Sequence, residues 1–179
     1  MSAGTVLWFT GLSGAGKTTI TSRVAEILQE QGRTVKILDG DVVRRELHQH
    51  LGFTPEDIKE NIRLLAQLCL KNLDDYDYVF VAAISPFREA RRKAKEAIGK
   101  NFLEVYVKAS LNTVIERDAK GLYKKALRGE IENFIGIDPK VPYEEPQTPD
   151  IILDTETQSI DQSVEKVLKE LLKVSAVES

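Results

Sequence analysis

The chain has 179 residues, of which 25 are Lys or Arg and 28 are Asp or Glu, and its formal net charge is −3. This length fits one domain spanning residues 1–179, and this charge excludes a generally basic surface for nucleic acid. The single cysteine, Cys69, excludes an internal disulfide framework and favours a reducing, cytoplasmic location.

Short apolar runs alternate with patterns of helical spacing. The run at residues 78–84, YVFVAAI, is almost continuously apolar, as in a strand covered on both faces. The expected elements, in chain order, are a strand at 5–10, a helix at 17–31, a strand at 35–38, a helix at 55–73, a strand at 78–84, a helix at 87–98, strands at 102–107 and 151–153, and a helix from 160 to 171. Strands separated by helices predict an α/β fold, in which a parallel sheet of about five strands carries helices on both faces.

Residues 119–149 break this regularity. The segment is rich in Gly, Pro and charge, and it exceeds the roughly 12–15 residues beyond which connectors are usually functional. One interpretation is a disordered insertion, but its aromatic residues and a nearby basic cluster favour a mobile lid that orders on a ligand. The cluster is either a solvated helix face or a counter-charge for polyanionic substrates, and consists of Arg117, Lys120, Lys124, Lys125 and Arg128.

Residues 11–18 read GLSGAGKT and match the phosphate-loop pattern G-x-x-x-x-G-K-[ST] at every fixed position, between an expected strand and an expected helix. Glycines let backbone N–H groups converge on phosphate oxygens, and a helix N-terminus adds positive potential. Lys17 would span the β- and γ-phosphates, and the Thr18 hydroxyl would hold Mg²⁺. The predicted ATP contacts in this loop are Gly11, Leu12, Ser13, Gly14, Ala15, Gly16, Lys17, Thr18 and Thr19.

The rest of the chain narrows the class of nucleotide protein. It contains no N-K-x-D guanine motif, which a regulatory GTPase would need, and motor or transporter ATPases are normally larger. A phosphate loop with a long basic lid in a small chain predicts a P-loop kinase for a small molecule, because a lid keeps water from the transferred phosphoryl group.

Two expected strands end in polar residues, where ligands bind in sheets of this kind. After the second strand come Asp39 and Asp41, one suited to hold Mg²⁺ through water and the other to accept a hydroxyl proton. The alternative is an Asp-Gly turn with a helix N-cap. Arg44 follows and suits an anionic part of the acceptor. After the third strand, Ser85 either caps the next helix or hydrogen-bonds the acceptor; it is not interpreted as a nucleophile, because direct transfer needs none.

These motifs together resemble the adenylylsulfate kinase (APS kinase) family over nearly the whole chain. The resemblance rests on GLSGAGKTT at 11–19, DGDVVR at 39–44, LGF at 51–53, EN-I-R at 60–63, ISPFREAR at 84–91, RDAKGLYKKA at 117–126, FIGID at 134–138 and PYEEP at 142–146. It implies Mg²⁺-dependent transfer of phosphate from ATP to the 3′-hydroxyl of adenosine 5′-phosphosulfate (APS). The products would be ADP and 3′-phosphoadenosine 5′-phosphosulfate (PAPS), in sulfate assimilation.

The resemblance also implies roles for single residues. Asp41 corresponds to the group that contacts the ribose 3′-hydroxyl, and Asp39 to the water-mediated magnesium contact. Phe53 and Phe134 correspond to a pair that sandwiches the acceptor adenine, and Arg117 corresponds to a residue that lies against the ATP adenine. The implied catalytic positions are Lys17, Asp39, Asp41 and Ser85. The implied acceptor contacts are Asp41, Arg44, Phe53, Asn61, Ile84, Ser85, Lys120, Asn133 and Phe134.

One position departs from the family pattern. Ile58 stands where relatives commonly carry an arginine, so the anion contact is either weaker or supplied by Lys59, Arg63 or Arg44. The histidines, His48 and His50, are expected on a solvated helix end, and Cys69 in the core.

The sequence also leads to expectations about partners and leaves two alternative functions open. The resemblance implies a homodimer and a functional link to ATP sulfurylase. No apolar run reaches the roughly 18 residues of a membrane span, and residues 1–4 lack the basic segment of a signal peptide. The alternatives left open are another small-molecule kinase on the same fold and a non-catalytic nucleotide-binding subunit associated with ATP sulfurylase.

Overall fold

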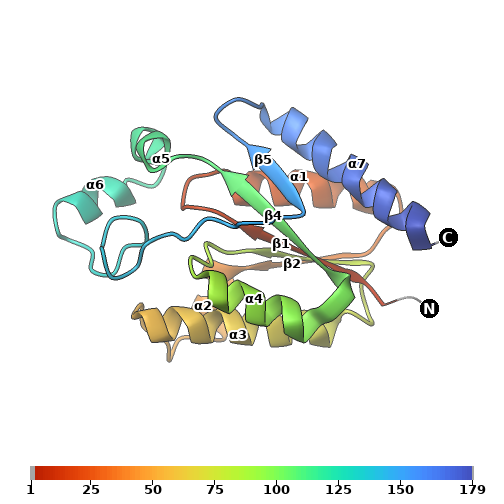
Figure 1. Cartoon of the computed structure of the whole chain (residues 1–179), viewed down its shortest axis with the longest axis horizontal. Helices are drawn as coiled ribbons and strands as arrows, with labels where there is room; N and C mark the ends of the chain where they lie inside the picture. Colours follow the sequence, from red (N-terminus) through yellow and green to blue (C-terminus); the bar gives the residue numbers. More distant parts are fainter. Residues whose placement is uncertain (1–2, 179) are drawn as a thin grey trace.

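The computed structural model describes residues 3–178. Three residues lie outside the described part of the chain. They are Met1 and Ser2, at the start of the stretch expected to lack the basic segment of a signal peptide, and Ser179, the last residue of the expected domain. Five parallel strands form one sheet in the order β2-β3-β1-β4-β5, which confirms the predicted α/β architecture (Figure 1). The strands are β1 (Thr5–Thr10), β2 (Val35–Asp39), β3 (Tyr78–Ala82), β4 (Phe102–Lys108) and β5 (Ile151–Asp154).

Helices cover both faces of the sheet (Figure 1). They are α1 (Lys17–Glu30), α2 (Gly40–Glu46), α3 (Pro55–Asn72), α4 (Arg88–Ile98), α5 (Leu111–Arg117), α6 (Leu122–Leu127) and α7 (Ile160–Glu178), with one 3₁₀ turn at Gly99–Asn101. Alternation along β1 divides the core: Leu7 and Phe9 pack with α1 and α7, whereas Val6 and Trp8 pack with α3 and α4. None of the helices among the described residues is long and apolar enough to cross a bilayer.

Helix α3 illustrates how local signals and burial combine. The Thr54 hydroxyl accepts a hydrogen bond from the Asp57 N–H, and Pro55 occupies the first turn, where its missing N–H costs nothing. Cys69 is fully buried on the inner face, as predicted, and burial raises the pKa of its thiol to about 12. This thiol is therefore a small core side chain and not a reactive thiolate.

Three short helices, α2, α5 and α6, were not predicted from a helical repeat, although a helix N-cap after the second strand was one alternative for the start of α2. They have 7, 7 and 6 residues, too few to show a helical repeat in the sequence. Their ends are held by particular bonds; for example, the Ser110 hydroxyl accepts from the Thr113 N–H at the start of α5. Helix α6 lies inside the segment expected to form a lid.

The second part of the segment 119–149 is anchored to the body. Val141 is fully buried, the hydroxyls of Tyr143 and Thr10 lie 2.9 Å apart, and the Glu144 N–H donates to the Pro86 carbonyl over 2.8 Å. The part that can move without breaking these contacts is thus shorter than the predicted segment and ends before Val141.

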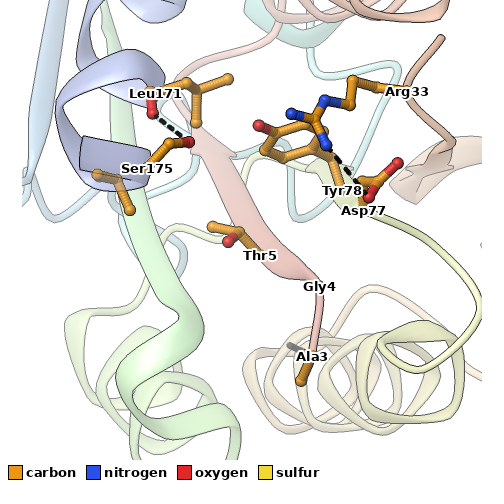
Figure 2. Close-up of a pocket in the computed structure, with 9 residues that line it drawn as sticks. Ala3, Gly4, Thr5, Arg33, Asp77, Tyr78, Leu171 and Ser175 are labelled. Carbon is orange, nitrogen blue, oxygen red and sulfur yellow. Dashed lines mark hydrogen bonds and ion pairs between the residues drawn. The ribbon is translucent and has the colours of Figure 1, made fainter. Parts of the chain in front are cut away.

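A small hollow of about 100 Å³ lies where β1 and β3 begin, beside α7 (Figure 2). Arg33 and Asp77 form an ion pair of 3.8 Å at its rim, and the Ser175 hydroxyl donates to the Leu171 carbonyl. This is the opposite edge of the sheet from the carboxyl ends of the strands, so the hollow is separate from the site described below.

Candidate active site

The phosphate loop connects β1 to α1 and takes a shape that requires glycine. Gly14 and Gly16 have φ angles of 81° and 114°, a region that side chains disfavour. A Cβ atom on Gly11 would lie 2.4 Å from the Val107 carbonyl oxygen, so the loop packs against β4 at van der Waals limits. Because α1 begins at Lys17, its N-terminal N–H groups face the loop, as anion binding requires.

Lys17 is buried against its own loop. Its Nζ donates to the carbonyl oxygens of Gly11 and Leu12, over 2.8 and 2.9 Å. Burial lowers its pKa to about 8, and the negative charge of Asp41 offsets part of that effect. The negative charge of a bound polyphosphate would raise the pKa of Lys17 again, so the protonated lysine and the phosphate would stabilise each other.

Asp39 serves two purposes at the end of β2. Its Oδ1 accepts from the N–H groups of Asp41 and Val42 and caps α2, which is the structural alternative raised by the sequence. Its Oδ2 accepts from the Thr18 hydroxyl over 3.5 Å. These two oxygen donors fit Mg²⁺, which prefers oxygen ligands and keeps several waters. Within residues 3–178 no three His, Cys, Asp or Glu residues cluster for a metal, so the phosphates and water would supply the remaining ligands.

Asp41 and Lys120 approach each other across the site. Lys120 Nζ lies 3.7 Å from Asp41 Oδ2, and both side chains are largely exposed. With Lys17 they line one cavity of about 540 Å³, which joins the phosphate loop, the end of β2 and the lid. The predicted lysine and carboxylates therefore share a single cleft. The predicted residues that line it are Ser13, Gly14, Gly16, Lys17, Thr18, Thr19, Asp39, Asp41, Phe53, Ile84, Lys120, Asn133 and Phe134.

A second hollow of about 80 Å³ adjoins this cavity. Both are lined by Asp41, Phe53 and Ile84, so they form neighbouring parts of one cleft. The predicted acceptor contacts that line the smaller hollow are Asp41, Arg44, Phe53, Asn61, Ile84 and Ser85. Gly11, Leu12, Ala15 and Arg117 do not line either space among the described residues.

Arg117 lies behind the phosphate loop. Its Nη1 donates to the Gly14 carbonyl over 3.4 Å, and its Nη2 donates to the Thr155 carbonyl over 2.8 Å. The guanidinium thus joins α5 to the loop and to the connection after β5.

The two predicted stacking residues come from different parts of the chain. Phe53, between α2 and α3, is 57% exposed, and the Arg44 guanidinium lies 4.5 Å from its ring centroid. Phe134, from the lid, packs edge-on against Tyr123 at 5.0 Å between centroids. Since both rings line the larger cavity, a flat ligand can meet each of them.

Arg44 is the cation that remains near Ile58. Ile58 is buried and lines the smaller hollow, as Arg44 does. Of the residues expected to compensate for the missing arginine, Lys59 lies over the Phe87 ring and Arg63 pairs with Glu60 at 2.6 Å. Neither lines the cleft, so of these three cations Arg44 is the one that lines the smaller hollow beside Ile58. Burial lowers the pKa of Arg44 from its usual value.

Ser85 is buried in a strained turn after β3. Its φ is 42°, its hydroxyl accepts from Trp8 Nε1 over 2.9 Å, and it donates to the Ala83 carbonyl over 3.2 Å. The N-cap alternative for Ser85 is wrong, because α4 begins at Arg88 and Phe87 occupies the cap position. Protein groups thus engage the Ser85 hydroxyl, while the residue also lines the smaller hollow.

Arg91 supports this turn and was missed by sequence reasoning. Its guanidinium is 2% exposed and donates to the Ser85 carbonyl and the Glu144 carbonyl, each over 2.6 Å, while Nε lies 3.2 Å from Glu104 Oε2. It joins the β3–α4 turn, the anchored end of the lid segment and β4. The sequence carries one signal: Arg91 shares a helical face with Ala94 and Ile98, which are both buried.

His48 also departs from its predicted place. It was expected on a solvated helix end, but it is buried, and its Nδ1 lies 2.7 Å from Asn61 Oδ1. The chain turns back after α2, where the His48 N–H donates to the Val43 carbonyl, and this folds the ring inward. His50, two residues on, is exposed as expected.

A phosphate loop at the end of β1, carboxylates at the end of β2 and a basic lid over both define a P-loop kinase. Residues 3–154 match the family model described as adenylylsulphate kinase. An adenylyl-sulfate kinase of Halothermothrix orenii is 49% identical over an alignment of 172 residues that covers 94% of this chain and 89% of that protein. The chain belongs to the adenylylsulfate kinase family.

Solved structures agree with this assignment. An APS kinase of Mycobacterium tuberculosis in complex with AMPPNP and APS is 40% identical, with a TM-score of 0.89 over 96% of this chain and 99% of that one. A hexameric APS kinase from Thiobacillus denitrificans is 30% identical, with a TM-score of 0.70 over 96% of this chain and 29% of that one.

Proposed function

We propose that this protein transfers the γ-phosphoryl group of ATP to the 3′-hydroxyl of adenosine 5′-phosphosulfate, giving ADP and PAPS for sulfate assimilation. The proposal rests mainly on one observation: Lys17 and Asp41 line the same cavity. That cavity adjoins the smaller hollow, where we place part of the acceptor. Membership of the adenylylsulfate kinase family supports the choice of acceptor.

ATP would bind with its phosphates on the loop between β1 and α1. Lys17 would exchange its two carbonyl partners for phosphate oxygens, and Thr18 and Asp39, the latter through water, would hold Mg²⁺. Bound Mg²⁺ neutralises charge on the phosphate oxygens. Arg117 would lie against the ATP adenine from its place behind the loop.

The acceptor would bind between α2, α3 and the lid. Phe53 and Phe134 would stack on its adenine, a contact worth about 1–3 kcal/mol per base. Arg44 and Asn61 would meet its anionic groups, and the turn at Ile84 would support the ribose. Ser85, Lys120 and Asn133 would complete these acceptor contacts.

Asp41 would accept the proton of the 3′-hydroxyl as that oxygen attacks phosphorus in line. Lys120, 3.7 Å from Asp41 in the free protein, would turn toward the transferred group and balance its charge. Closure of the lid, up to its anchor near Val141, would exclude water from the reaction.

Product analysis tests this function directly. The protein is incubated with ATP, Mg²⁺ and APS, and the nucleotides are separated; the proposal predicts equal amounts of ADP and PAPS. ADP formation with another acceptor but not with APS would favour a different small-molecule kinase. Tight ATP binding without turnover on any acceptor would favour a non-catalytic subunit. Asp41→Asn serves as the inactive control.

We also propose an oligomeric state, a metabolic partner and a cellular location for the enzyme. A homodimer is expected for this family, and a hexameric APS kinase among the similar structures supports self-association. A link to ATP sulfurylase, whose product is APS, and a cytoplasmic location belong to the same expectation. Light scattering after size-exclusion chromatography measures the oligomeric state.

A further inference from the structure

Two histidines lie close together after α2 and differ in their surroundings. The ring centroids of His48 and His50 are 6.4 Å apart, but His48 is 6% exposed, whereas His50 is exposed. His48 Nδ1 lies 2.7 Å from Oδ1 of Asn61, which is itself 7% exposed. The contact therefore joins two polar side chains that solvent hardly reaches, and such groups are costly to leave without a hydrogen bond.

An asparagine amide has two ends of opposite polarity and nearly the same shape. A ring nitrogen that carries a hydrogen can bond only to the amide oxygen. His48 with its proton on Nδ1 thus selects one of the two orientations of Asn61. With Oδ1 committed to His48, the amide N–H₂ is the end left for the hollow that Asn61 lines.

We propose that His48 is a positioning residue for the acceptor: its Nδ1–H holds the Asn61 amide with the N–H₂ donors toward the acceptor hollow. The proposal rests on the proposed function, because it takes Asn61 as an acceptor contact. Donors suit that place, since the acceptor carries phosphate and sulfate oxygens. Arg44, whose guanidinium carries only donors, lines the same hollow.

The same bond holds one wall of the hollow in place. His48 belongs to the connection between α2 and α3, and Asn61 lies on α3. The His48 backbone is fixed at both ends: its N–H donates to the Val43 carbonyl, and its carbonyl accepts from the Leu51 N–H. The ring itself is buried against Asn61, so it cannot swing out to follow a turning amide, and the amide orientation follows the ring.

Kinetics of matched variants test the proposal. His48→Leu removes the donor and should raise KM for APS about tenfold, with kcat and KM for ATP within twofold of wild type. His48→Asn restores a donor near the Nδ1 position and should recover most of the loss. His50→Leu, the exposed neighbour, should change neither constant. Equal increases in KM for APS and for ATP in His48→Leu would overturn the proposal, as would failure of His48→Asn to recover affinity.

A double-mutant cycle separates this proposal from the proposed function. Asn61→Ala alone should raise KM for APS; if it does not, the acceptor site itself is misplaced. In the Asn61→Ala background, His48→Leu should add no further increase, because the group that His48 positions is gone. A full additional increase, with a normal effect of Asn61→Ala, would overturn only the role of His48.

The tautomer of His48 is a test that needs no destabilising variant. The chain has two histidines, so a ¹⁵N-labelled sample shows two imidazole rings, and His50→Gln assigns them. At pH 8.5, where an ordinary imidazole is neutral, His48 should carry its hydrogen on Nδ1. A hydrogen on Nε2, with Nδ1 bare, would mean the opposite amide orientation and would overturn the proposal.

Discussion

We predict that nucleotide binding is linked to proton uptake by Lys17. In the free protein, burial lowers the pKa of Lys17 to about 8, and Asp41 offsets part of that effect. A bound triphosphate adds negative charge, so Lys17 keeps its proton to higher pH in the complex. Binding should therefore take up little proton at pH 7 and an increasing fraction of one proton as the pH rises through about 8 to 9.

The sign of the pH effect follows from the same pKa. Above about pH 8, affinity for nucleotide should fall by up to about tenfold per pH unit, since one pKa unit corresponds to about 1.4 kcal/mol. Phosphate oxygens with a second pKa near 6 are already ionised there, so the nucleotide charge stays constant. The free energy of unfolding of the protein without nucleotide should rise between about pH 8 and 10.5. In this range Lys17 is still protonated in the unfolded chain but has lost its proton in the folded protein, so raising the pH favours the folded state.

Calorimetry measures this proton uptake. A non-hydrolysable ATP analogue with Mg²⁺ is titrated at pH 7, 8 and 9 in two buffers of different ionisation enthalpy, and the difference in heat gives the number of protons. Lys17→Met is the control and should show no uptake. Uptake near zero in the wild-type protein at pH 8 and 9, or equal uptake in Lys17→Met, would refute the reasoning.

Three further predictions concern the acceptor side and its support. Asp41→Asn should lower kcat by about 10²–10⁴-fold with unchanged ATP binding, as the loss of a general base would; near-normal turnover in a coupled ADP assay would contradict that role. Phe134→Ala should raise KM for APS by about 5- to 100-fold and KM for ATP by less than threefold, since one stacking contact is lost; equal increases in steady-state kinetics would count against stacking. Glu104→Gln should lower the free energy of unfolding by about 1–3 kcal/mol, because the buried Arg91 loses its charged partner. Urea unfolding measures this, with the exposed Glu89→Gln as a control that should unfold like wild type; an equal stability of both variants would contradict the supporting role of Arg91.

The parts of the fold that the sequence predicts are those with local signals. All five strands and the four longer helices are confirmed to within a few residues, apart from the C-terminal end of α7, because each carries an apolar run or helical repeat. The phosphate loop is recognisable because its geometry demands glycine at set positions, as the φ angles of Gly14 and Gly16 show. The cleft followed because parallel strands bring Lys17 and Asp41 to one edge of the sheet.

What the sequence did not predict depends on contacts between distant residues. His48 follows a helix of two turns, and its burial depends on α3, which begins seven residues later. Arg91 is buried because its guanidinium donates to the carbonyls of Ser85 and Glu144. Glu144 lies 53 residues away in the sequence, so this contact cannot be read from the residues around Arg91. Val141 likewise packs in the part of the core that holds Val6, Trp8 and the inner faces of α3 and α4, all of them distant from it in the sequence. The helical face that Arg91 shares with Ala94 and Ile98 indicates its burial. No pattern in the sequence identifies the distant partners of His48, Arg91 and Val141.

The position of the transferred phosphate on the product is the most direct test of the proposed reaction, transfer to the 3′-hydroxyl of APS. The enzyme is given ATP, Mg²⁺ and either APS or its 3′-deoxy analogue, and ³¹P NMR locates the new phosphate ester. The proposed function, with Asp41 as the base, predicts a phosphate on the 3′-oxygen alone and an analogue that binds but is not phosphorylated. Phosphate on any other oxygen, or turnover of the 3′-deoxy compound, would contradict it.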